Sequence, residues 1–226
     1  MMTTTSIIGI TAIREHWGDE YPDCNGDEQS PIDLTGETET DLTDITFNYQ
    51  SSPLEIVNNG HTIVANVEAG SSIVSDGVTY NLLQFHFHAQ SEHQVDGVSY
   101  PMEMHLVHKS ADEVLAVVGV FLEGGGAENG SFSTVLDNMP AEEEGTEEPA
   151  DDVDPADLLP AAKTYYKYDG SLTTPPCSEG VKWHVLETPV ELSDAQIAQF
   201  TDLFDHNYRP VQDLNGRTLE LDNTPS

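Results

Sequence analysis

Basic residues are scarce in this chain. Its 226 residues include 7 Lys and Arg against 41 Asp and Glu, which gives a formal net charge of −34. So few scattered cations cannot form a phosphate-binding stripe, and a field of this sign repels nucleic acid and anionic lipid. Binding of nucleic acid is therefore excluded as a function.

The acidic surplus also bears on the solvent in which the protein works. In dilute buffer the mutual repulsion of so many carboxylates destabilises the compact state, and concentrated salt screens that repulsion. We interpret the composition as a halophile-like, salt-adapted acidic surface. The alternatives are a calcium-binding acidic coat and a solvated exterior that resists aggregation.

Long apolar runs are absent as well. No stretch approaches the roughly 20 apolar residues that span a bilayer, so we do not expect an integral membrane protein. Residues 1–10 (MMTTTSIIGI) have no basic region and too short an apolar stretch for a secretory signal peptide. We expect the chain to begin at or near a mature N-terminus. Its 37 % of hydrophobic residues still provides enough material for a folded core.

Cysteine is limited to Cys24 and Cys177. The two lie too far apart in the sequence for a CxxC redox or zinc pair. They are either two inert buried thiols or one long-range disulfide, and we favour the disulfide. A disulfide implies an oxidising compartment, so we expect an extracellular or periplasmic location.

Strand signals cover most of the chain. Short runs rich in Val, Ile, Thr and aromatic residues alternate with turns such as Asn-Gly and Asp-Gly. The predicted strands are 44–50, 54–59, 61–68, 71–90 and 99–109. Together they predict a meandering antiparallel sheet. The run 113–123 (EVLAVVGVFLE) is continuously apolar, as is typical of a central strand buried on both faces.

Helix signals are fewer. Residues 193–206 begin with a capping box at Ser193 and Gln196 and place four apolar residues on one face, and 131–139 is a weaker candidate. Residues 141–157 contain nine acids, two prolines and no aromatic residue, which predicts a solvated surface loop. Because strand signals resume on both sides of this loop, we predict one domain over 1–226.

Nine histidines carry the clearest chemistry in the sequence. His86 and His88 stand two apart on a predicted strand, so their side chains share one face, with Phe85 and Phe87 on the other. The segment MEMHLVHK (102–109) groups Glu103, His105 and Val107 on one face in the same way. If the two strands pair through the turn between them, the imidazoles of His86, His88 and His105 converge. Three neutral imidazoles suit Zn²⁺, and a free fourth position makes such a site catalytic.

Two further polar residues fit this pattern. Gln84 precedes His86 by two positions and Glu103 precedes His105 by two, so each lies on the face of its histidine and can accept the second ring N–H. The alternative is that a His-x-His pair arises by chance in a histidine-rich chain. The register of the surrounding polar residues favours the metal.

These residues and several other segments strongly resemble the α-class carbonic anhydrases. The shared segments, in the same order, are EQSPIDL (28–34), NNGH (58–61), QFHFHAQSEH (84–93), MEMHLVH (102–108) and GSLTTPPCSEGVKW (170–183). The similarity runs from His16 to Arg217. It implies a mainly β fold with one large twisted, mostly antiparallel central sheet and a few short helices. It also implies zinc-dependent, reversible hydration of carbon dioxide to bicarbonate and a proton.

The resemblance assigns roles to individual residues. Thr173 orients the zinc-bound hydroxide that attacks carbon dioxide, and it donates a hydrogen bond to Glu92, a buried acceptor that is not a ligand. Thr174 lies beside it on the bicarbonate side. His61 shuttles the proton, because an imidazole titrates near neutral pH and can relay protons through water. The apolar wall that receives carbon dioxide comprises Val107, Val117, Leu172, Val181 and Trp183.

Further expectations follow from the same resemblance. A Cys24–Cys177 bridge would pin the catalytic loop to the N-terminal segment, and cis peptide bonds are expected at Ser30-Pro31 and Pro175-Pro176. Sulfonamides and anions are expected to inhibit at the zinc, weak esterase activity is expected as a side reaction, and a homodimer is possible by analogy.

Two other functions compete with this assignment. His86, His88 and Glu92 also match the His-x-His-x₃-Glu portion of a cupin site, in which Glu92 would be a ligand of iron or manganese. The third possibility is a non-catalytic acidic binding protein on the carbonic anhydrase fold. All three ligand histidines are present, which argues against it.

Overall fold

The computed structural model describes residues 17–224 of the chain. The expectation for residues 1–10 and the start of the family resemblance at His16 therefore lie outside the described residues. Among the described residues, no helix has the length and apolar character needed to cross a membrane.

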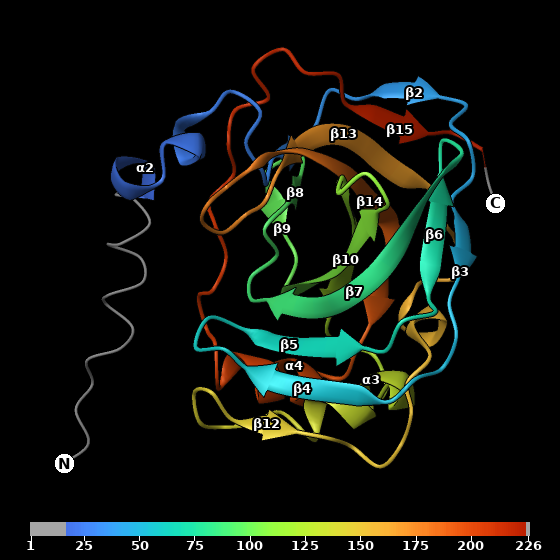
Figure 1. Ribbon diagram of the computed structural model, residues 1–226, viewed down its shortest axis with the longest axis vertical. Coiled ribbons are helices and arrows are strands. Elements are labelled where there is room, and N and C mark those ends of the chain that lie inside the picture. The colour runs from blue at the N-terminus through green and yellow to red at the C-terminus, as the bar shows by residue number, and fades with distance from the viewer. Residues whose placement is uncertain (1–16, 225–226) are drawn as a thin grey trace.

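A twelve-stranded sheet dominates the fold (Figure 1). Its strands are β2 (Thr38–Thr40), β3 (Thr46–Asn48), β4 (Leu54–Asn58), β5 (Ile63–Val67), β6 (Ser72–Ser75), β7 (Val78–His88), β10 (Met102–Ser110), β11 (Leu115–Glu123), β12 (Thr146–Glu147), β13 (Tyr165–Ser171), β14 (Glu179–Glu191) and β15 (Glu220–Asp222). The main path runs β12-β4-β5-β7-β10-β11-β14-β13-β15-β2, and β6 joins β3 to β7. Most neighbours are antiparallel, with parallel pairs at β11–β14 and β15–β2. The predicted fold class is confirmed.

The centre of the sheet follows the register predicted from the histidines. β10 pairs antiparallel with β7 so that His105 lies opposite His86. β11 lies between β10 and β14, and all but its two terminal residues are buried. β13 and β14, which the sequence analysis did not single out, pair antiparallel on the far side of β11.

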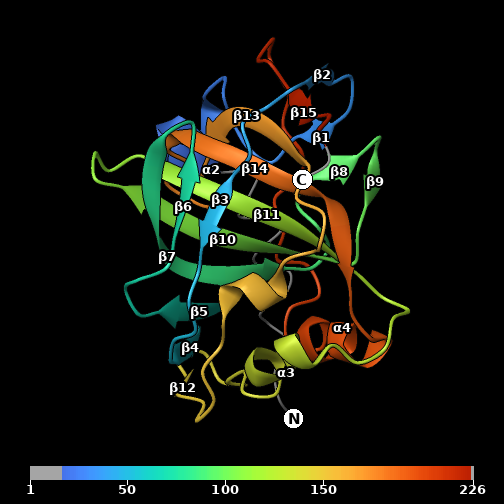
Figure 2. The same ribbon diagram turned by 90° about the vertical axis from the view of Figure 1, so that its right-hand side faces the viewer.

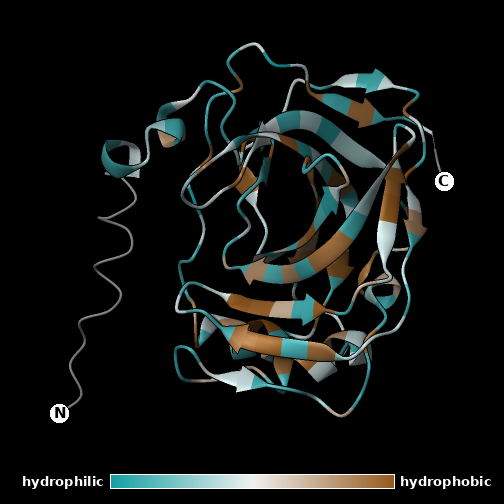
Figure 3. Ribbon diagram, viewed as in Figure 1, coloured by the Kyte–Doolittle hydropathy of each residue, from teal (hydrophilic) through white to brown (hydrophobic). Residues whose placement is uncertain are grey.

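Side-chain alternation divides the core between the two faces of the sheet. Phe85 and Phe87 are fully buried in the larger apolar cluster, while His86 and His88 point to the other face. In Figure 3 the colour of β7 switches repeatedly between hydrophobic and hydrophilic along the strand. A second apolar cluster includes Ile32 and Trp183. The histidines therefore emerge from a strand whose reverse side is anchored in the core.

Short helices lie at the periphery. They are α2 (Trp17–Glu20), α3 (Gly130–Leu136) and α4 (Asp194–Thr201), with 3₁₀ helices η1 (Pro22–Asn25) and η2 (Pro155–Leu158). The predicted capping box is present at Ser193 and Gln196, but α4 ends at Thr201 instead of 206. Figure 2 shows α3 and α4 close together at one end of the molecule.

The acidic segment 141–157 is mostly exposed, yet it is tied to the sheet. Within it, β12 pairs with the edge strand β4. Val153 is buried and exchanges two backbone hydrogen bonds with Ser52. The expectation of a purely solvated loop is therefore corrected, because the segment continues the sheet by one short strand.

A separate three-stranded sheet joins the N-terminal region to the turn between β7 and β10. It consists of β1 (Asp33–Leu34), β8 (Gln94–Val95) and β9 (Val98–Ser99). Cys24 and Cys177 form a disulfide with their Cα atoms 4.9 Å apart, and the expected cis bonds at Ser30-Pro31 and Pro175-Pro176 are present. A third cis bond joins Ala89 to Gln90.

Candidate metal centre

Three imidazoles converge on the open face of β7 and β10. His86 and His88 come from β7 and His105 from β10, and one nitrogen from each ring lies within 4.8 Å of the others. The ring centroids are 4.6–5.3 Å apart. His88 and His105 are buried and His86 is half-buried. The strand pairing alone brings the three rings together.

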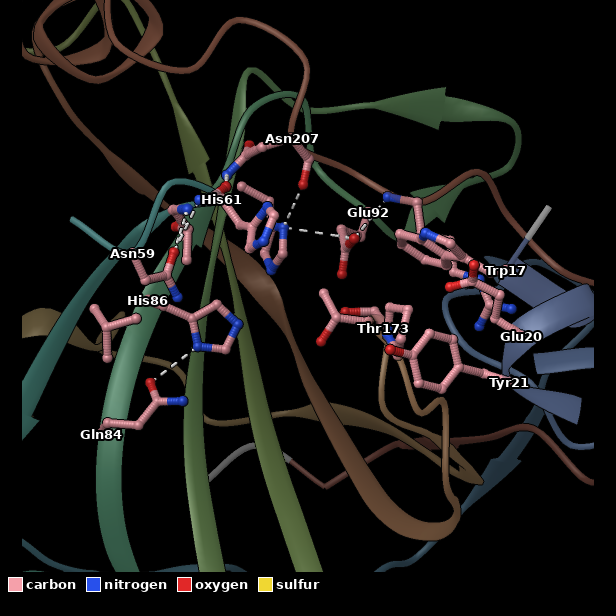
Figure 4. A pocket seen from close by; sticks show the side chains of 16 residues that line it. Trp17, Glu20, Tyr21, Asn59, His61, Gln84, His86, Glu92, Thr173 and Asn207 are labelled. Carbon is pink, nitrogen blue, oxygen red and sulfur yellow. Dashed lines mark hydrogen bonds and ion pairs between the residues drawn. The ribbon is translucent and has the colours of Figure 1, made fainter. Parts of the chain in front are cut away.

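Each ring uses its other nitrogen to contact the protein. Nδ1–H of His86 donates to Oε1 of Gln84 at 2.9 Å, as Figure 4 shows. Nε2–H of His105 donates to Oε1 of Glu103, also at 2.9 Å. Nδ1–H of His88 donates to the backbone carbonyl of Asn207 at 3.0 Å. These contacts fix the tautomers and leave Nε2 of His86, Nε2 of His88 and Nδ1 of His105 with free lone pairs.

The free nitrogens fit a metal ion. Nε2 of His88 is buried and has no hydrogen-bond partner among the described residues, a costly state for a polar atom unless a ligand satisfies it. Three neutral imidazole nitrogens with oriented second nitrogens match the donor set of a catalytic zinc site. Glu92 is not part of the three-histidine group, which disfavours the cupin-like alternative.

Electrostatics keep two of the ligands neutral. Burial lowers the pKa of His86 well below its usual value, and the neighbouring His88 and His105 lower it further. Burial also lowers the pKa of His88, although Glu92 partly opposes this shift. For His105 burial acts in the same direction, but Glu103 and, to a smaller extent, Glu92 together outweigh it and raise the pKa. Neutral imidazole is the form that binds a metal.

Glu103 lies at the centre of a buried hydrogen-bond network. Its Oε1 accepts from His105 and, at 2.7 Å, from Nδ1 of His93, and its Oε2 accepts from the backbone N–H groups of Glu92 and His93. Burial alone would raise the pKa of Glu103, but His93 and His105 lower it well below its usual range. His93 continues the network to the hydroxyl of Tyr168 at 2.7 Å. His93, Glu103 and His105 also lie close enough together to hold a metal ion. Because their polar atoms already bond to one another, we interpret these three residues as a hydrogen-bond chain that supports the ligand His105.

Glu92 and Thr173 lie beside the three histidines. Oε1 of Glu92 accepts from the backbone N–H of Arg209 at 2.7 Å, while Oε2 is buried with no hydrogen-bond partner among the described residues. The hydrogen bond expected from Thr173 to Glu92 is therefore not formed in this structure. Thr173 is buried but lines the same pocket. Glu92 thus offers a free acceptor next to the metal-binding face.

The side chain of Arg209 anchors this arrangement to the N-terminal region. Its guanidinium donates to Oε1 of Gln29, to the carbonyl of Ser30 and to the carbonyl of Cys24. Gln29 in turn donates to the carbonyl of Cys177. The backbone that holds Glu92 is therefore connected to both partners of the disulfide.

A pocket of about 520 Å³ opens above the histidines. The predicted residues that line it are His61, Gln84, His86, His88, Glu92, Thr173 and Thr174. His61 and Thr174 are exposed. Asn207 and Arg209 also line the pocket, and sequence reasoning missed both of them.

The residues predicted as an apolar wall lie elsewhere. Val107, Val117, Val181 and Trp183 are buried in the second apolar cluster, Leu172 packs against it, and none of these five lines the pocket. Trp183 is packed edge-on against His105, with the ring centroids 4.9 Å apart. In this structure the five side chains belong to or pack against this cluster, and their contact with carbon dioxide stays a prediction.

Fold and site together define a mainly β protein in which three histidines that could hold a metal ion lie together beside a pocket. A sequence model of the eukaryotic-type carbonic anhydrases matches residues 13–223. The chain belongs to this carbonic anhydrase family.

Individual relatives are similar over nearly the whole chain. A carbonic anhydrase of Klebsiella pneumoniae is 47 % identical over 212 residues, covering 91 % of this chain and 86 % of that protein. A hyperthermostable carbonic anhydrase from an active hydrothermal vent chimney superposes with a TM-score of 0.89 at 46 % identity, covering 93 % and 96 % of the two chains. The α-carbonic anhydrase of Thermovibrio ammonificans, solved with the inhibitor sulfanilamide, has a TM-score of 0.89 at 43 % identity and covers 92 % and 94 %.

Proposed function

We propose that this protein catalyses the reversible hydration of carbon dioxide to bicarbonate and a proton at a zinc ion held by His86, His88 and His105. One observation carries the proposal: each imidazole is oriented by its own protein partner, and the three rings offer nitrogens that lie within 4.8 Å of one another. When bound there, zinc supplies Lewis acidity that lowers the pKa of water from 15.7 to about 7.

The remaining residues position the reactants and move the proton. In this proposal the free Oε2 of Glu92 accepts a hydrogen bond from the hydroxyl of Thr173, which leaves the threonine oxygen as an acceptor toward the reacting water. Orientation of this kind converts a random encounter into a productive one. His61, exposed at the pocket, can take the proton to solvent. Thr174 lies at the pocket on the side proposed for bicarbonate.

The function is tested by stopped-flow hydration of carbon dioxide. We expect the zinc-loaded protein to be active, a chelator to abolish activity, added Zn²⁺ to restore it, and a sulfonamide to inhibit it. Activity that survives complete removal of metal would contradict the proposal. Metal analysis that finds stoichiometric iron or manganese in place of zinc would favour the cupin-like chemistry instead.

We further propose that the acidic surface is an adaptation to salt. Support comes from burial: among the described Asp and Glu residues, only Glu92, Glu103 and Asp222 are buried. We expect the melting temperature to rise with KCl because screening relieves repulsion. A larger rise with Ca²⁺ at matched ionic strength would favour a calcium-binding coat. No change with either salt would favour a merely solvated exterior.

The disulfide supports a proposed extracellular or periplasmic location, since such bonds persist in oxidising compartments. Fractionation of the source cells tests this proposal. The homodimer stays a prediction, to be checked by light scattering at several protein concentrations.

A further inference from the structure

The pairing of β5 with β7 stops before the end of β7. The register ends at the pair Val64–His86, whereas β7 continues to His88. Beyond this point the carbonyl oxygens of His61 and Phe87 both accept hydrogen bonds from one side chain of another segment. Two carbonyl oxygens cannot bond to each other, so holding them together requires a group with two donors.

The side-chain amide of Asn207 is that group. Its Nδ2 donates to the carbonyl of His61 and to the carbonyl of Phe87, both at 3.0 Å. Its Oδ1 accepts from the backbone N–H of Ala89 at 2.7 Å. These three bonds determine which end of the amide is nitrogen. Figure 4 shows Asn207 at the pocket near the backbone of His61.

The backbone of Asn207 makes a separate contact with the metal site. Its carbonyl accepts from Nδ1–H of the ligand His88 at 3.0 Å, and its N–H donates to the carbonyl of Ala89 at 3.1 Å. One residue therefore touches a zinc ligand through its main chain and the His61 turn through its side chain. A side-chain substitution removes the bond to the His61 turn, together with the bonds to the backbone of Phe87 and Ala89, while the main-chain bond to His88 itself can remain.

Other residues of the turn have a different task. Asn58 accepts from the N–H of Gly60, and Asn59 accepts from the N–H of His61. These bonds shape the turn from within but do not attach it to β7. The hydroxyl of Thr62 does reach the carbonyl of Phe87, at 2.5 Å. Among the described residues, Asn207 is the one whose side chain bonds to the backbone of His61 from another part of the chain.

We propose that the side chain of Asn207 is a positioning residue for proton transfer: it sets the distance between the His61 imidazole and the zinc site. The inference rests on the proposed function, because it takes His61 as the proton carrier. Proton transfer through water is sensitive to geometry, and a misplacement of about 1 Å can cost about 10²-fold in rate. The hydration step does not involve the His61 turn, so its rate is independent of this contact.

The test compares Asn207→Asp and Asn207→Ala with Asn48→Asp. The aspartate keeps the shape but replaces the two donors by an acceptor, whereas the alanine removes them without adding charge. Asn48 is exposed on β3 and does not line the pocket, so its variant controls for the added charge. Stopped-flow kinetics in weak buffer give kcat and kcat/KM, and competition with a chelator gives the zinc dissociation rate.

We expect kcat to fall about tenfold in both Asn207 variants, while kcat/KM stays within about twofold. At saturating substrate every turnover must release a proton, so kcat reports that step. Imidazole buffer should restore kcat, because it carries the proton in place of His61. The zinc dissociation rate should not change. The Asn48 variant should match the wild type.

Several results would overturn the proposal. A parallel fall of kcat and kcat/KM, or faster loss of zinc, would show that Asn207 supports the metal site itself. A His61→Ala variant tests the shuttle role separately from the positioning role. If the turnover of this variant does not depend on buffer, His61 is not the proton shuttle. If its turnover depends on buffer but that of the Asn207 variants does not, only the positioning role of Asn207 is wrong. If neither Asn207 variant folds, hydrogen exchange of the Asn207 side-chain amide in the wild type tests the proposal. Slow exchange supports the hydrogen bonds to His61 and Phe87, and rapid exchange contradicts them.

Discussion

The two sides of the pocket are constructed in different ways. The ligand side rests on neighbouring strands, with His105 of β10 directly opposite His86 of β7. The opposite side is carried by irregular segments: Thr173 follows β13, and Asn207 follows α4 in the chain. Strand side chains are placed by the ladder itself, whereas the irregular segments depend on contacts with distant parts of the sequence.

Three such contacts hold the irregular side. The disulfide connects Cys24 to Cys177, which lies close after Thr173. The side chain of Arg209 bonds to the N-terminal segment, and that of Asn207 bonds to the His61 turn. We infer that metal retention depends mainly on the strands, with the main-chain carbonyl of Asn207 orienting His88, while alignment of the reactants depends on the three long-range contacts. Variants on the two sides should therefore fail in different ways.

Loss of a ligand should have the largest effect. We expect His105→Ala to lose stoichiometric zinc and nearly all hydration activity, because two imidazoles cannot replace three at this site. Metal analysis and stopped-flow kinetics measure both. His206→Ala is the matched control, since His206 is exposed and does not line the pocket. Full activity with bound zinc in the His105 variant would refute the ligand assignment.

A change on the irregular side should spare the metal. Thr173→Val keeps the shape but removes the hydroxyl that is proposed to donate a hydrogen bond to Glu92, and we expect intact zinc with turnover reduced about 10²-fold. The double variant with Glu92→Gln sharpens the test. If the two residues act together, the second substitution adds little to the first. Fully additive losses would mean that Glu92 and Thr173 act independently.

The same contrast explains what the sequence allowed us to predict. The alternation of side chains along a strand was sufficient to place His86 and His88 on one face of their strand and Glu103 on the histidine face of the next, because strand geometry is local. Asn207 carries no local signal, since its partner His88 is 119 positions away. Arg209 is similar, with 117 positions to Glu92.

Secondary structure shows the same limit. The capping box marked the start of α4 correctly, yet nothing local marked its end at Thr201. β14 does alternate, with Val181, Trp183 and Val185 in one cluster, and that pattern could have revealed the strand. The short strand in the acidic segment could not be predicted, because its pairing depends on the exposed edge of β4.

Removing the disulfide should have an intermediate effect. For Cys24→Ser combined with Cys177→Ser we expect the free energy of unfolding to fall by about 2–5 kcal/mol, as is usual for a native disulfide. Urea denaturation measures this. Because the bond ties the Thr173 loop and not the strands, turnover should fall while the zinc content is retained. Loss of zinc in parallel with turnover would show that the two sides of the pocket are not independent.

The smallest expected effect concerns a histidine on the other face of the sheet. His184 is buried on β14 and its Nε2 contacts Oγ of Ser75 at 2.8 Å. Burial lowers its pKa to about 4, and Lys167 contributes in the same direction. Its folded-state pKa therefore lies below the unfolded value of about 6.5. Between these two values the unfolded chain binds a proton that the folded protein does not, so stability falls as the pH drops from about 6.5 to about 4.

This shift predicts a measurable difference between the wild type and His184→Gln. Glutamine stays neutral at every pH and can still bond to Ser75, so the variant lacks the penalty from this site. Between pH 7 and pH 5 the wild type should lose about 2 kcal/mol more of unfolding free energy than the variant. Urea titrations at the two pH values test this, with His206→Ala as the exposed control. An identical loss of unfolding free energy in wild type and His184→Gln would mean that His184 is solvated in the folded state. The two faces of the sheet would then not separate the histidines proposed to bind metal from buried structural ones.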